Sequence, residues 1–134
     1  MIDLITARVQ FLQNSITADL SRIPVKLHGD LQSIGILTPQ DLIMLDNSRT
    51  LKVDLYPEDY HGEQLLELVD RKSDSLGAVN KLCYTIHCMD NRDRNKFFES
   101  LDKNKYYTLS EAQYDIDRLR EQRRTKNKKV RLER

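Results

Sequence analysis

The chain has no tryptophan, and only four glycines, three prolines and two cysteines among its 134 residues. Two cysteines cannot build the disulfide framework that holds together a small secreted domain. Its uninterrupted apolar runs are only a few residues long, far below the ~20 that cross a bilayer, so no membrane span is expected. The opening MIDLITARVQFLQ lacks a basic segment followed by an apolar one, so no secretory signal is expected. These absences together predict a cytoplasmic protein.

Sequence signatures of common enzyme classes are missing as well. There is no glycine-rich phosphate loop, no GxSxG and no HExxH. Only the segment CYTIHC, residues 83–88, brings cysteine and histidine together. Cys83 and His87 share a helix face, but zinc takes three or four protein ligands and a catalytic cysteine needs an activating base. We therefore expect Cys83 to be a buried apolar-like residue, and we expect no catalytic residue, metal or cofactor.

Charge is distributed unevenly along the chain. Residues 1–117 contain 13 Lys/Arg against 19 Asp/Glu, whereas residues 118–134 contain 9 against 2. The formal net charge of +1 therefore conceals an acidic body and a basic tail. The cations of this basic tail include Arg118, Arg120, Arg123, Arg124, Lys126, Lys128, Lys129 and Arg131.

Three interpretations of the basic tail remain open. Clustered Lys and Arg release counterions from phosphate, which favours nucleic acid or an anionic membrane surface. No aromatic residue follows Tyr114, so a platform on which bases could stack is absent. The tail could equally be a solvated helical linker, or it could fold back onto the acidic body. A long coiled coil is not expected, because Arg123 and Lys126 interrupt the heptad pattern.

Apolar residues recur at three- and four-residue spacing along most of the chain, which predicts helices. A first helix is predicted over residues 4–20 and a second over 27–34, ended by Gly35. Thr38-Pro39 predicts the start of a third, with Thr as N-cap and Pro at the first position. Residues 47–56 are predicted to form a loop. Later stripes predict further helices near residues 57–72, 79–89 and 97–101, and one that starts at Ser110.

Four packing motifs are similar to those of one family. They are Gly35-Ile36-Leu37-Thr38; Leu65, Leu66 and Val69 with the charged turn Arg71-Lys72-Ser73-Asp74; Ala78, Leu82 and Ile86; and Phe97, Phe98 and Leu101. On these motifs residues 1–103 resemble a caspase recruitment domain (CARD) of the death-fold superfamily. The resemblance implies an all-α, six-helix Greek-key bundle without enzymatic activity. Residues 104–134 would then form a linker and a helical basic extension.

The resemblance also implies a function and a set of contact residues. A CARD acts as an adaptor in apoptotic or inflammatory signalling, binding another CARD-containing protein homotypically or associating with itself into filaments. One recurring contact joins a basic patch on helices one and four to an acidic patch on helices two and three. Arg8 matches the basic position of helix one, whereas Glu63 stands at the helix-four position and departs from the pattern. Asp30, Asp41 and Asp46 match the acidic side. Nucleic-acid binding through the basic tail is the alternative function.

Overall fold

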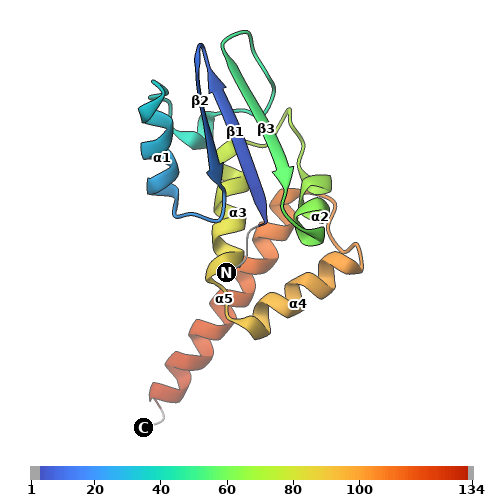
Figure 1. The fold of residues 1–134 in the computed structure, drawn as a ribbon. Helices are drawn as coiled ribbons and strands as arrows, with labels where there is room; N and C mark the ends of the chain where they lie inside the picture. Colours follow the sequence, from blue (N-terminus) through green and yellow to red (C-terminus); the bar gives the residue numbers. More distant parts are fainter. Residues whose placement is uncertain (1–3, 133–134) are drawn as a thin grey trace.

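The structure, a computed structural model, describes residues 4–132 and the side chains of residues 4–122. It combines a three-stranded antiparallel sheet with helices, in a mixed α/β arrangement (Figure 1). In chain order the elements are β1 Ile5–Phe11, β2 Asn14–Asp19, α1 Pro24–Ser33, the 3-10 turn η1 Gln40–Leu42, β3 Leu51–Pro57, α2 Tyr60–Leu68, α3 Leu76–Cys88, α4 Asn91–Asp102 and α5 Leu109–Leu132.

The expected all-α six-helix bundle is wrong, because residues 5–19 form a β-hairpin and not a helix. In β1 the side chains of Ile5, Ala7 and Val9 are buried, while those of Arg8 and Gln10 are exposed. This alternation has a period of two, which is the period of a strand with one buried face. The wider spacing of the larger apolar residues in this stretch matched a helix only by coincidence.

The predicted loop at residues 47–56 is also wrong, since β3 occupies Leu51–Pro57. This strand pairs with β1, so the sheet has the order β2-β1-β3. Its outer edge is closed by side chains: Asn47 Oδ1 accepts a hydrogen bond from the backbone N–H of Val53 at 2.9 Å, and Ser48 Oγ accepts from that of Leu51 at 3.0 Å. Arg71 Nη2 donates to the carbonyl of Val53 at 2.5 Å. Such capping keeps an edge strand from pairing with another chain.

Most of the later helices lie where the sequence places them. Ser75 caps α3 by accepting a hydrogen bond from Ala78 N at 3.1 Å, and the residues that define its apolar stripe are buried. The predicted third helix is reduced to η1, and Thr38 does not cap it. The chain leaves η1 in extended form because the carbonyl of Ile43 accepts a hydrogen bond from Leu76 N at 2.8 Å. That contact fixes this segment against the start of α3.

The core lies between the buried face of the sheet and the helices. Helix α1 contacts β2, α2 contacts β3, and α3 runs between them (Figure 1). On its other side α3 contacts α5, and α4 packs against α2. The opposite face of the sheet is largely exposed, with Arg8 at its centre between Thr17 of β2 and Asp54 of β3.

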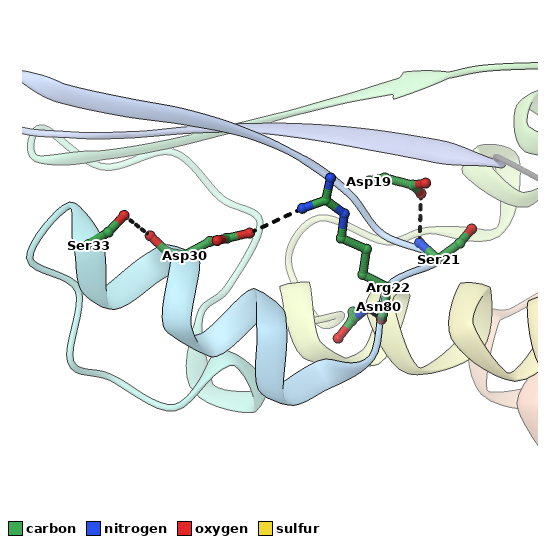
Figure 2. Close-up of polar contacts among 6 residues, drawn as sticks. All are labelled: Asp19, Ser21, Arg22, Asp30, Ser33 and Asn80. Atoms are coloured by element: carbon green, nitrogen blue, oxygen red, sulfur yellow. Dashed lines mark hydrogen bonds and ion pairs between the residues drawn. The ribbon is translucent and has the colours of Figure 1, made fainter.

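A buried amide holds three distant segments together. Asn80 of α3 is fully buried, and its Nδ2 donates to the carbonyls of Leu20 at 2.8 Å and Arg22 at 2.9 Å. Its Oδ1 accepts from Gln40 Nε2 at 2.8 Å. Figure 2 shows Asn80 beneath the connection from β2 to α1, where Asp19 Oδ1 also accepts from Ser21 N at 2.8 Å. This amide therefore joins the β2–α1 connection and η1 to α3.

We predict that Asn80→Leu lowers the free energy of unfolding by about 2–4 kcal/mol, because it leaves two carbonyls and the Gln40 amide buried without their partner. Urea denaturation measures the loss. The matched control is Asn95→Leu on the exposed side of α4, which should change stability by less than about 0.5 kcal/mol. Equal stability of the two variants would contradict the role given to Asn80.

Two glycines in helices should respond oppositely to alanine. A Cβ on Gly77 would lie 2.1 Å from Asp41 Oδ1 and 2.8 Å from the backbone N of Asp41, whereas one on Gly29 would meet nothing within 4 Å. Gly77→Ala should therefore destabilise the fold by roughly 1–3 kcal/mol. Gly29→Ala should stabilise it by roughly 0.5–1 kcal/mol, since alanine orders a helix at lower entropic cost. Thermal melts of the two variants, each compared with the parent chain, check both signs.

Candidate functional site

The CYTIHC segment lies at the end of α3 and contributes mainly to packing. The side chain of Cys83 is fully buried, as expected. Burial, with a smaller contribution from the charge of Asp19, raises the pKa of the Cys83 thiol, which keeps it from forming the thiolate that a nucleophile requires. Cys88 is exposed. Among the described residues no three His, Cys, Asp or Glu side chains gather in a way that could hold a metal ion.

The residues expected to bind a partner do not gather on one surface. Arg8 lies on the exposed face of the sheet, Asp41 in η1 and Asp46 in the connection that precedes β3. Asp30 belongs to α1, which packs beside β2, and Glu63 to α2, which packs beside β3, the opposite edge of the sheet. The contact implied by the resemblance needs patches on helices one to four of a bundle. These positions do not form such patches.

Asp30 already has a partner within the chain. The side chain of Arg22 reaches from the β2–α1 connection along α1, and its Nη1 lies 3.7 Å from Asp30 Oδ2 (Figure 2). Ser33 Oγ donates a hydrogen bond to the backbone carbonyl of Asp30 at 2.5 Å. Both side chains of the ion pair are more than a third exposed, so the pair contributes little to stability. The pair nevertheless offsets the negative charge of Asp30 to which a basic partner would bind.

An exposed acidic stripe runs along α2. Asp59, Glu63 and Glu67 follow one another at four-residue spacing and are all exposed, which places like charges along one side of the helix. Asp59 caps α2 by accepting a hydrogen bond from Gly62 N at 2.8 Å. Neither of the two ion pairs found among residues 4–122 involves this stripe. Of the five expected partner-binding residues, only Glu63 belongs to it.

Residues 118–132 of the basic tail form the C-terminal part of α5. Thr108 Oγ1 accepts a hydrogen bond from Glu111 N at 3.2 Å and donates to Glu111 Oε1 at 3.2 Å, so Thr108 caps the start of the helix. Leu109, Ala112 and Ile116 are buried, and this part of the helix packs on α3. Beyond it the helix continues to Leu132 and extends past the rest of the molecule (Figure 1).

A groove of about 690 Å³ separates α4 from α5. Its wall includes the cations Lys96, Lys105 and Arg118. Arg118 Nη2 lies 2.9 Å from Asp115 Oδ1, and the Tyr106 hydroxyl donates a hydrogen bond to the other oxygen of that carboxylate. One cation of the groove, Arg118, is therefore already paired with a carboxylate of the same groove. Sequence reasoning missed it, although the Thr108-x-x-Glu111 pattern could have located the start of α5.

Comparisons with family models, with curated proteins and with solved structures give no match to this chain. The CARD resemblance therefore rests on the four motifs alone, and the fold that it implies is wrong. Within the described residues, no helix is both long and apolar enough to cross a membrane.

The groove gives one prediction for alkaline pH. Partial burial and the hydrogen bond to Asp115 raise the pKa of Tyr106 to about 12 from 10.0. Because the folded state favours the neutral phenol, this contribution to stability is complete below pH 10 and is lost as the pH rises toward 12. Absorbance of tyrosinate should show one tyrosine titrating near pH 12, and Tyr106→Phe should remove that step. Loss of a step near pH 10 instead would contradict the assignment.

Proposed function

We propose that this chain is a non-enzymatic nucleic-acid-binding protein, and that its binding element is the C-terminal half of α5. The observation that carries the proposal is the path of α5, which leaves the body as one helix and bears the basic tail (Figure 1). Nucleic acid is the polyanion that a series of closely spaced Lys and Arg fits best, because each phosphate that is neutralised releases a condensed counterion.

The charge of the body supports contact through the tail alone. Residues 1–117 carry six more acidic than basic side chains, and residues 118–134 carry seven more basic than acidic ones. Phosphates are repelled by the acidic body and attracted by the tail, so charge orients the protein with α5 toward the ligand. Separation of the charged parts matters here, since a tail lying on its own body would be neutralised before it met a partner.

An interaction module for proteins is the second candidate, and the acidic stripe on α2 favours it. Asp59, Glu63 and Glu67 offer a basic partner a row of carboxylates that form no ion pair among residues 4–122, and such complementarity selects partners and speeds their encounter. A role as an adaptor in apoptotic or inflammatory signalling stays a prediction in this form. The homotypic CARD contact is not proposed, because β1 and β2 replace the expected first helix and η1 replaces the third. Self-association is tested by light scattering of the full chain at low and high salt.

A cytoplasmic location also stays a proposal. Cys83 and Cys88 are both free thiols, which suits a reducing compartment.

Replacing Arg123, Arg124 and Lys126 together by glutamine tests the main proposal. Glutamine keeps the helix propensity and removes three charges. We expect affinity for a fluorescein-labelled oligonucleotide to fall on the order of 100-fold at 0.1 M salt, and the slope of log K against log salt to become shallower by about 3. Fluorescence anisotropy over a KCl series measures both.

The control for this experiment is a charge-matched change on the body. Lys26 of α1, Lys72 of the turn before α3 and Lys81 of α3 are exposed. Their joint replacement by glutamine should leave affinity within about twofold, since we expect the acidic body to make no phosphate contact. If the unaltered chain failed to bind at 50 mM salt, or if both triple variants lost affinity equally, the proposal would be wrong.

A further inference from the structure

We infer that the tail presents its charge as a preformed helix to the major groove of duplex DNA, and that single strands and double-stranded RNA are poorer ligands. The inference rests on the proposed function and adds the class of nucleic acid. Its basis is that the basic residues continue a helix that is already fixed to the body, and do not belong to a separate arm.

The fixed part of α5 removes the main cost of forming the tail helix. An isolated helix must first order one turn at a net cost in free energy, whereas each residue added later gains a hydrogen bond. In this chain the N-cap at Thr108 and the buried Leu109, Ala112 and Ile116 order the first turns on α3. The tail therefore only extends an existing helix. Its Arg, Lys and Gln residues are good helix formers, and cations near a helix C-terminus interact favourably with the helix dipole.

The dimensions of the extension suit the major groove of B-form DNA. From Arg120 to Leu132 the helix is about 20 Å long at ~1.5 Å per residue. An α-helix with its side chains is about 10–12 Å wide, which matches the ~12 Å width of that groove. The major groove of A-form RNA is too narrow for such a helix. Duplex DNA thus accepts the extension along its whole length, with phosphates on both sides.

The composition of the extension argues against the other polyanions. Proteins that hold single strands stack the bases on aromatic side chains, and no aromatic residue follows Tyr114. Helices that lie on anionic membranes need an apolar face, and no apolar residue occurs between Leu119 and Val130. Both absences leave a helix that can use charge and shape but neither stacking nor insertion.

Repulsion between like charges destabilises the tail helix, and a bound polyanion should relieve that repulsion. Arg120, Arg124 and Lys128 follow at four-residue spacing, an arrangement that destabilises a helix by a few tenths of a kcal/mol per pair. Phosphates on both walls of a groove neutralise such a row. Binding of duplex DNA should therefore raise the temperature at which the tail helix melts, which circular dichroism of the complex can follow.

The test compares one sequence as duplex DNA, as single-stranded DNA and as duplex RNA, each labelled and about 20 nucleotides long, together with vesicles of anionic lipid. We expect the full chain to bind duplex DNA at least tenfold more tightly than either other nucleic acid at 0.1 M salt, and to bind vesicles only weakly. Lys128→Gln with Lys129→Gln should make the salt slope for duplex DNA shallower by about 2. Lys26→Gln with Lys81→Gln should leave it unchanged.

The decisive variant is Asn127→Pro, which keeps every charge but breaks the helix. We expect the affinity of this variant for duplex DNA to fall to the affinity of the unaltered chain for single strands. The thermal stability of the body should be unchanged. If Asn127→Pro kept the preference for duplex DNA, or if the unaltered chain bound all three nucleic acids or the vesicles equally well, the groove-binding inference would be overturned while charge-driven binding by the tail would stand. If none of the nucleic acids bound at 50 mM salt, the proposed function would fall with it.

Discussion

The buried side chain of Asn80 is the point at which three parts of the chain, distant in sequence, meet. Its three hydrogen bonds reach Leu20, Arg22 and Gln40, so α3 is fixed at once to the end of the hairpin, to the start of α1 and to η1. A buried amide is costly unless it is satisfied, which makes this arrangement specific as well as stabilising. Once α3 is placed in this way, its other side is free to receive α5.

The position of α5 on α3 decides how the charges of the protein are arranged in space. The buried side chains of Ala112 and Ile116 fix the first turns of the helix to the body. The helix then continues away from the body in one direction (Figure 1). The excess of acidic residues lies on the body, including the stripe on α2, while the basic residues of the tail extend away from it. Because the same helix contains the anchor and the charge, a ligand bound to the tail is held at a defined distance and angle from the acidic surface.

Local signals in the sequence located most of the helices, and the basic tail was evident from composition alone. Capping residues such as Ser75 and the apolar stripe of α3 depend only on neighbours in the chain. The sheet depends on residues far apart, since β1 pairs with β3 across more than 40 residues; the alternation in β1 was hidden by larger apolar residues at helical spacing. The contact roles expected for Arg8 and Glu63 depended on a six-helix bundle. The structure is a sheet with helices, so those roles have no structural basis.

In the absence of any ligand, α5 is expected to hold its basic residues away from the body as a continuous helix. Backbone chemical shifts of the isotope-labelled full chain, recorded at low salt, test this most directly for residues 120–132. Helical shifts without contacts between the tail and α2 are the result predicted here. Random-coil shifts, or cross-peaks between the tail and the stripe at Asp59, Glu63 and Glu67, would contradict the account and would instead support a tail that folds back and masks the acidic surface.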